Sequence, residues 1–301
     1  MNYYNEIKNK LIDNEVYKKV KDYSKNRNDL STYYEVGKLL IKAQGGEERA
    51  KYGDNLIKEY SERLFNDTGR KYNITALKRI RQFYLVVEKG VPLAHQLTWS
   101  HYCELLPLKD INEINYYIKI TIEQCLSKRQ LRERIRNKEY QRLDDKTKLK
   151  LINKEEIDIK DNIKNPIIIK NKLDIDKEIV SEKILQRLIL EDIPSFLEEL
   201  GTGYSFIKNE YKIKLGERYN YIDLLLFNIE YNCYVVVELK VTELKKEHIG
   251  QIQIYMNYID NSLRKLTQDK TIGLIICKKD NKYVIEYSSD KRILSREYEL
   301  I

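Results

Sequence analysis

Residues 219–260 read YNYIDLLLFNIEYNCYVVVELKVTELKKEHIGQIQIYMNYID, and most of what can be predicted for the C-terminal half starts from them. Two apolar runs, at about 221–228 and 233–241, have the length and composition of β-strands. The residues between them supply a turn, which predicts that the two strands pair. A helix is expected to follow, from about residue 246 to residue 260.

Three charged residues occupy these two predicted strands. Side chains alternate between the faces of a strand, so Glu238 and Lys240 should point one way and Leu239 the other. If the strands pair, Asp223 and Glu238 converge at adjacent strand positions. Two carboxylates beside an ammonium group form a site for a hard cation next to a lysine that positions water. This is the chemistry of a nuclease; the alternative is a surface ion pair at the strand ends.

The elements around this pair of strands predict the fold class. The order helix, strands, helix, strand indicates an α/β sandwich with a mixed central sheet. A helix is expected over about 178–200, which Pro194 kinks or splits. The remaining predicted strands are at about 204–207, 210–213, 271–277 and 283–287.

The N-terminal half, to about residue 140, is predicted to be almost wholly helical. A helix at about 52–66, a turn at 66–69 and a basic helix at about 76–84 are compatible with a helix-turn-helix or winged-helix DNA-binding domain. The alternative is an ordinary helical bundle with a solvated basic face. The residues predicted to contact nucleic acid here are Arg70, Lys78, Arg79 and Arg81.

A second basic helix begins after a serine cap at Ser127. Its predicted phosphate contacts are Lys128, Arg129 and Arg132, although helices this rich in charge are commonly just solvated. Trp99, the only tryptophan, is predicted to be a packing anchor. His101 has no second ligand at metal-binding spacing, which favours a structural role for it.

The composition changes at residues 144–176, where alternating charges, asparagines and Pro166 predict an exposed connector. A short strand could form at 167–169. The predicted domains are therefore a helical, DNA-binding domain at 1–143, the connector at 144–176 and a nuclease domain at 177–301.

Composition sets the broad class of the protein. The net charge of +8 fits a polyanionic partner. The four cysteines are scattered without a CxxC pair, so neither a zinc site nor a disulfide framework is expected. We find no apolar signal region and no run long enough to span a membrane, and we expect a cytoplasmic protein.

These residues together resemble a known family. Asp223, Glu238-Leu239-Lys240 and the following helix look like the core of the PD-(D/E)XK nucleases. The longer runs YIDLL at 221–225 and VVVELK at 235–240, with Gln251 after them, resemble the YhcG-type family. So does the N-terminal half, which matches a DUF1016-type domain through YEVGK at 34–38, LTWSH at 97–101 and SKRQL at 127–131.

The resemblance implies roles for individual residues. Asp223, Glu238 and the backbone carbonyl of Leu239 would bind a divalent metal, Mg²⁺ or Mn²⁺. Lys240 would orient or help deprotonate the attacking water, and Gln251 would orient that lysine or a phosphate.

Two positions depart from the family pattern. Gln186 stands where many members have an acidic metal ligand, so that ligand is either missing or supplied by Glu182. Ile222 replaces the proline that commonly precedes the aspartate.

We therefore predict a metal-dependent nuclease that hydrolyses duplex or branched DNA with an activated water. The alternative is a catalytically impaired protein that binds DNA or RNA and retains the nuclease fold. The tyrosine-rich helices would also permit a homodimer.

Overall fold

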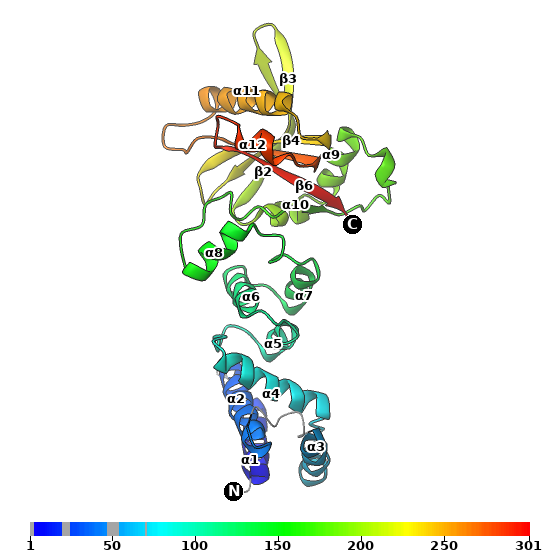
Figure 1. Cartoon of the computed structure of the whole chain (residues 1–301), viewed down its shortest axis with the longest axis vertical. Coiled ribbons are helices and arrows are strands. Elements are labelled where there is room, and N and C mark those ends of the chain that lie inside the picture. The colour runs from blue at the N-terminus through cyan, green and yellow to red at the C-terminus, as the bar shows by residue number, and fades with distance from the viewer. Residues whose placement is uncertain (1–2, 20–24, 47–53, 70) are drawn as a thin grey trace. The chain divides into compact units, whose positions relative to one another are not determined.

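The structure is a computed structural model that describes residues 3–19, 25–46, 54–69 and 71–301. The chain divides into two compact units, Met1–Tyr140 and Gln141–Ile301. Figure 1 labels the helices and strands of both units.

The described part of the first unit consists of helices and loops. Its helices are α1 (Tyr3–Lys19), α2 (Lys25–Ala43), α3 (Asp54–Thr68), α4 (Ile74–Glu88), α5 (Trp99–Leu105), α6 (Ile111–Glu123) and α7 (Lys128–Arg136). A helical N-terminal region was predicted and is confirmed. No strand occurs among its described residues, so these contain no β-hairpin wing.

Close packing of α2 against α4 explains a glycine in the first unit. A Cβ atom on Gly37 would lie 2.6 Å from both the carbonyl oxygen of Ile80 and the Cβ of Tyr84. Only glycine therefore fits this approach. Trp99 packs against Tyr33 and Phe83, with ring centroids 4.6 and 5.4 Å apart, as expected of a packing anchor.

The second unit is built on one six-stranded mixed sheet with strand order β1-β6-β5-β4-β3-β2. The strands are β1 (Ile167–Ile169), β2 (Tyr204–Leu215), β3 (Arg218–Asn228), β4 (Cys233–Glu243), β5 (Ile272–Lys279) and β6 (Ile293–Leu300). The two pairings among β2, β3 and β4 are antiparallel, and the other three pairings are parallel.

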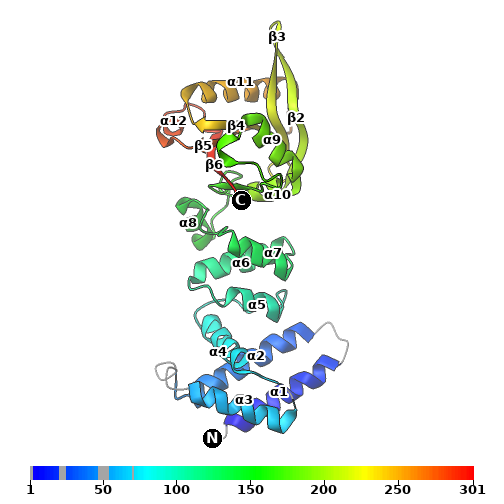
Figure 2. The ribbon, with the colours of Figure 1, turned by 90° about the vertical axis from the view of Figure 1, so that its right-hand side faces the viewer.

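Helices cover both faces of this sheet (Figure 2). On one face, α9 (Glu182–Glu191) and α10 (Ile193–Leu200) pack on a core that includes Val237 and Leu239. On the other face, α11 (Lys246–Ser262) packs on a core that includes Val236 and Ile275. Pro194 stands at the start of α10, so the predicted helix at 178–200 is indeed split. The predicted α/β sandwich with a mixed sheet is confirmed.

The segment 144–176 differs from the exposed connector that its composition predicts. It contains α8 (Asp145–Asn153), which was not expected. The short strand expected at 167–169 is present as β1, which is buried and pairs with β6 as an edge of the sheet. Ile159 and Ile163 are also buried in the core beneath α9 and α10. Thr147 and Lys164 are buried as well. Ile159 and Ile163 stand singly among polar residues, a pattern too sparse to predict burial from the sequence.

The end of the chain also differs from expectation. Residues 283–287 were predicted to be a strand but lie in the short helix α12 (Lys282–Glu286), with Tyr283 and Tyr287 exposed. The strand beside β5 is β6. A parallel strand after β5 needs a crossover connection, and residues 280–292 provide it.

Candidate active site

Strands β3 and β4 bring Asp223 and Glu238 together. The register pairs Leu224 with Val237, which places the two carboxylates at neighbouring positions. The Oδ2 atom of Asp223 accepts a hydrogen bond of 2.7 Å from the backbone N–H of Leu239. The predicted convergence of the two carboxylates is therefore present in the structure.

A break in the regular alternation of β3 occurs at Asp223. Ile222 packs in the core beneath α11, whereas Leu224, two residues later, packs in the core beneath α9 and α10. Residues two apart on a regular strand share a face, so the backbone rotates locally at Asp223. Across from Asp223 on β2, Glu210 has a positive φ of 46°. The irregularity thus involves both strands at the site.

Glu238 is a buried carboxyl group whose hydrogen-bonding capacity is only partly used. Its side chain is 2% exposed, and its Oε1 atom has no hydrogen-bond partner among the described residues. Burial, and then the charge of Asp223, raise the pKa of Glu238 to about 8. A buried carboxylate oxygen without a donor is costly, and a bound cation would offset that cost.

Lys240 lies between two carboxylates. Its Nζ atom is 3.4 Å from Oε2 of Glu238 and 3.6 Å from Oε2 of Glu182, the first residue of α9. Burial lowers the pKa of Lys240, but the charges of Glu238 and Glu182 outweigh it, so the pKa lies above its ordinary value. Lys240 is therefore a charged donor in this site.

Gln186 has a structural role beside the site. Its Nε2 atom donates a 2.9 Å hydrogen bond to the backbone carbonyl of Asp223. It therefore supports the irregular backbone of β3. Glu182, one turn earlier on α9, is the residue of this helix whose carboxylate approaches Lys240.

The helix α11 places Gln251 near the site, although Gln251 does not contact Lys240. Its Nε2 atom donates to the hydroxyl of Tyr255 at 3.1 Å. Burial raises the pKa of Tyr255, the hydrogen bond from Gln251 opposes this, and the charges of Glu238 and Asp223 raise it further. The hydroxyl of Tyr255 thus lies within the electrostatic influence of the two carboxylates.

Sequence reasoning missed three residues near the site: Tyr255, His248 and Glu210. Burial, and then the charge of Lys240, lower the pKa of His248. The charge of Glu210 raises the pKa of Asp223, for which burial is the largest cause. Tyr255 and His248 lie one turn from Gln251 on the same helix, and this spacing was the available signal. Glu210 gives no signal, because its place depends on strand pairing.

The site offers a small set of hard ligands for a metal. Among the described residues, no three His, Cys, Asp or Glu side chains gather into a ready-made metal centre. Lys240 contacts one oxygen of Glu182 and one oxygen of Glu238. The carboxylate of Asp223 and the other oxygen of Glu238 remain as ligands. The unpartnered oxygen of Glu238 shows that these residues fit a divalent cation that keeps several of its own waters.

The basic residues of the first unit are partly neutralised. Glu104 forms ion pairs with Lys128 at 3.4 Å and with Arg132 at 2.8 Å. Arg129 is exposed, as is Arg79. Lys78 is half-buried, and Arg70 lies outside the described residues.

Arg81 and His101 of this unit both form hydrogen bonds within it. Arg81 donates to Oε1 of Gln44 at 3.2 Å. His101 accepts a hydrogen bond at Nδ1 from the backbone N–H of Thr98, which makes it part of the cap of α5. A structural role was favoured for His101, and this contact provides one.

Two domain families match the chain, one for each half. The YhcG PDDEXK nuclease domain matches residues 160–301, and the DUF1016 N-terminal domain matches residues 9–142. Each half of the chain thus matches the domain family that its motifs resemble. The predicted resemblance is therefore confirmed, and the second unit has the PD-(D/E)XK fold.

A curated protein is similar to this chain over most of its length. It is "Putative nuclease YhcG" of Escherichia coli (strain K12), 26% identical over 310 aligned positions that cover 90% of this chain and 83% of that protein.

Two solved structures are similar over part of the chain. One is a repair endonuclease from Pyrococcus abyssi, with a TM-score of 0.28 and 16% identity over 40% of this chain and 47% of the other. The second is an EndoMS–dsDNA2 complex, with a TM-score of 0.29 and 19% identity over 40% of this chain and 44% of the other.

None of the helices among the described residues is long and apolar enough to cross a bilayer.

Proposed function

We propose that the protein is a metal-dependent deoxyribonuclease that hydrolyses phosphodiester bonds with water. The observation that carries this proposal is the state of Glu238, which is buried beside Asp223 and Lys240 with one oxygen unpartnered. A fold without a function there would gain by replacing such a group with an apolar one. Perturbed carboxylates of this kind cluster at catalytic sites.

Asp223 and Glu238 would hold Mg²⁺ or Mn²⁺, and the carbonyl of Leu239 is assigned as the third protein ligand. The bound ion would supply positive charge at the scissile phosphate and acidify a water molecule. Two protein carboxylates suit Mg²⁺ because this ion dehydrates reluctantly and takes few protein ligands.

Lys240 would orient the attacking water and offset negative charge on the phosphate. We assign it as a donor and not as a base, because its neighbours raise its pKa and keep it protonated. Glu182 would hold Lys240 in place and could approach the metal when substrate displaces the ion pair. Gln251 and Tyr255 would position the metal ligands from α11.

The first unit would bring the nuclease unit to DNA, duplex or branched. Its exposed Arg79 and Arg129 are suited to phosphate contacts, and Lys78, Lys128 and Arg132 would add to them. We assign α3 and α4 as a helix-turn-helix pair, with α4 approaching the DNA. A cytoplasmic location and homodimer formation remain predictions from the sequence, and light scattering tests the second.

The test compares two lysines on adjacent strands. Lys240→Ala should abolish Mg²⁺-dependent cleavage of a panel of linear, circular and branched DNA while leaving the protein folded. Lys279→Ala, which removes an exposed lysine paired with Glu243 on the neighbouring strand, is the matched control and should cut normally. Wild-type cleavage rates in the Lys240→Ala protein would refute the assigned chemistry.

A second candidate function is binding without catalysis. It is favoured by Gln186, which stands where an acidic ligand is expected in this family. Calorimetric titration with Mg²⁺ separates the two functions. Heat of binding that disappears in Glu238→Gln supports the nuclease, whereas no binding by the intact protein at millimolar Mg²⁺ supports the binding protein.

A further inference from the structure

The hairpin of β2 and β3 extends past α11, as both views of the molecule show (Figures 1 and 2). Its strands pair up to Leu215 and Arg218, on either side of a turn at Gly216 and Glu217. Strand β3 connects the tip of the hairpin to the active site, because Asp223 lies on β3 a few residues beyond the turn.

One face of the hairpin packs against the protein. Ile213 and Ile222 are almost fully buried in the core beneath α11, and Tyr211 and Leu215 pack partly against the same core. These residues account for the stability of the hairpin.

The opposite face carries two tyrosines and two lysines in direct register. Lys212 pairs with Tyr221 and Lys214 pairs with Tyr219. Tyr219 is 55% exposed and Tyr221 is 52% exposed, and both lysines are exposed. We call these four residues the tyrosine–lysine face.

A contact within this face orders one of the rings. The Nζ atom of Lys212 lies 3.7 Å from the centroid of the Tyr219 ring, a cation–π contact. The ring is thereby held on the surface of the hairpin while more than half of it remains accessible to a ligand.

Protection of the sheet edge explains only part of this composition. β2 is the edge strand, and lysines on an edge strand discourage pairing with other chains. The two tyrosines lie on β3 at positions that pair with β2 but lie outside the stretch, Leu224–Asn228, that pairs with β4. Charged residues, proline and bulges are what protect an exposed strand edge, and exposed aromatic rings do not, so edge protection gives no reason for the two tyrosines.

We propose that the tyrosine–lysine face binds unpaired nucleotides of the nucleic-acid substrate next to the scissile phosphate. Tyr219 and Tyr221 stack with two bases, and Lys212 and Lys214 contact the phosphates that link them. Aromatic rings interleaved with basic residues are the recognition elements of single-stranded nucleic acid. This inference rests on the proposed function, since it describes the substrate of the same site.

The spacing of the strand supports this arrangement. Residues two apart on a strand are separated by about 7 Å, which suits bases of an extended single strand and exceeds the stacking distance in a duplex. Asp223 is two residues beyond Tyr221, so the same rise separates the Cα atoms of these two residues along β3. The rotation of β3 at Asp223 means that their side chains do not share one face. The stacked bases would lie within a few nucleotides of the cleaved bond.

The test measures binding in EDTA, so that its result does not depend on cleavage. The full chain is titrated into a fluorescent single-stranded DNA and into the duplex of the same sequence. Tyr219→Ala/Tyr221→Ala should weaken binding to the single strand by about 20-fold or more and binding to the duplex by less than about threefold. Tyr219→Phe/Tyr221→Phe keeps both rings and should bind as the wild type does.

The matched control is Tyr283→Ala/Tyr287→Ala, which removes two more exposed tyrosines from α12 of the same unit. This control should bind single strands as the wild type does. Unchanged single-strand affinity in the Tyr219/Tyr221 alanine variant, or equal losses for duplex and single strand, would overturn the proposal. A protein that binds as expected but fails to cut with Mg²⁺ would instead refute the proposed function alone.

A second measurement addresses the lysines. Lys212→Gln/Lys214→Gln should reduce the slope of log affinity against log salt for single strands by roughly 1.4, about 0.7 for each lost phosphate contact. An unchanged slope would show that neither lysine contacts a phosphate. A single-stranded RNA of the same sequence, run in parallel, shows which nucleic acid the face prefers.

Discussion

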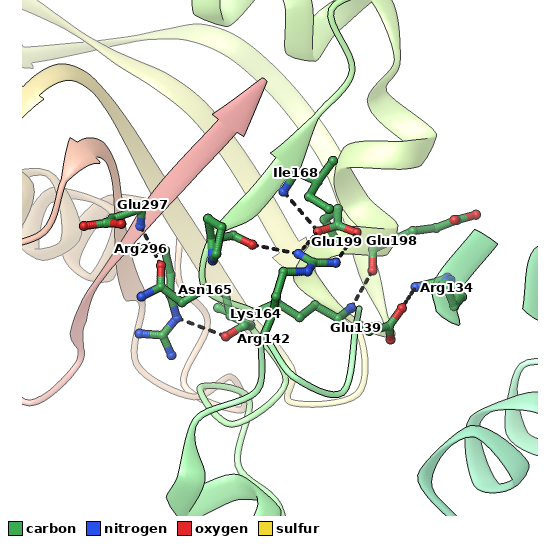
Figure 3. A network of polar contacts seen from close by, with 12 residues as sticks. Arg134, Glu139, Arg142, Lys164, Asn165, Ile168, Glu198, Glu199, Arg296 and Glu297 are labelled. Carbon is green, nitrogen blue, oxygen red and sulfur yellow. Dashed lines mark hydrogen bonds and ion pairs between the residues drawn. The ribbon is translucent and has the colours of Figure 1, made fainter. Parts of the chain in front are cut away.

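The second unit contains two buried acid–base pairs, and they are built in opposite ways. Glu199 on α10 accepts hydrogen bonds from both terminal nitrogens of Arg142 and from the backbone N–H of Ile168 (Figure 3). Arg142 in turn donates to the carbonyl of Pro166 at 2.7 Å. Both carboxylate oxygens of Glu199 thus have charged or backbone donors.

The pair at the candidate active site is incomplete by comparison. Glu238 has one contact with Lys240, at the long distance of 3.4 Å, and its second oxygen has no partner among the described residues. A second carboxylate, Asp223, lies beside it and raises its pKa. The Arg142–Glu199 pair stabilises the packing of α10 against β1. The Lys240–Glu238 pair leaves a buried carboxylate that is only partly compensated.

This contrast suggests how to separate structural from functional charges in such a fold. A buried charge with all its hydrogen-bonding capacity used has nothing left to offer a ligand. A buried charge with unused hydrogen-bonding capacity is able to bind a ligand, which we propose is a cation here. The following predictions test that distinction, from the largest expected effect to the smallest.

Glu199→Ala should lower the free energy of unfolding by about 3–5 kcal/mol, because it leaves Arg142 buried without its counter-charge. Urea unfolding measures this loss. The control is Glu198→Ala, the exposed neighbour on the same helix, which should change stability by no more than about 0.5 kcal/mol. Equal losses in the two variants would break the comparison.

Glu238→Gln should make the metal-free protein more stable than the wild type at alkaline pH, by on the order of 2–4 kcal/mol. The pKa of Glu238 is raised to about 8 in the folded protein, so the folded state binds more protons than the unfolded state below that pH. Stability from this group is present in acid and is lost as the pH rises through about 8.

Urea unfolding in EDTA at acidic and alkaline pH measures this difference, since glutamine does not titrate. The wild type and the glutamine variant should converge in acid. Parallel pH profiles would contradict the high pKa of Glu238.

Gln186→Glu should cost about 1–3 kcal/mol of stability and should not tighten Mg²⁺ binding. A glutamate cannot donate to the carbonyl of Asp223, and it adds a third negative charge near Asp223 and Glu238. Urea unfolding and calorimetry measure the two effects, with Arg187→Gln on the exposed side of α9 as the control. Tighter Mg²⁺ binding by Gln186→Glu would show instead that position 186 is a ligand position.

Gln251→Ala should have the smallest effect, lowering cleavage by a few-fold and stability by about 1 kcal/mol or less. Its partner in the structure is Tyr255, not Lys240. A double-mutant cycle with Tyr255→Phe should therefore give a coupling energy of about 0.5–1 kcal/mol. Additive effects of the two substitutions would show that the Gln251–Tyr255 hydrogen bond is unimportant.

The sequence predicted much of the second unit because the necessary signals are local. The runs around Asp223 and Glu238 have strand composition, and the ELK triplet fixes which side chains share a face. The helix after β4 and the break at Pro194 were predictable for the same reason. The segment 283–287, which reads YVIEY, was misread because residues of high strand propensity also occur in a short surface helix such as α12.

The amino-acid sequence by itself determined that a nuclease-type fold follows a helical domain, and it identified Asp223, Glu238 and Lys240 as the residues to examine. Only the tertiary structure decided that β3 rotates at Asp223, that Gln186 supports its carbonyl, and that Glu238 retains an oxygen without a partner. These features depend on strand register and on the packing of α9 and α11. Both join residues far apart in the chain, so no local pattern records them.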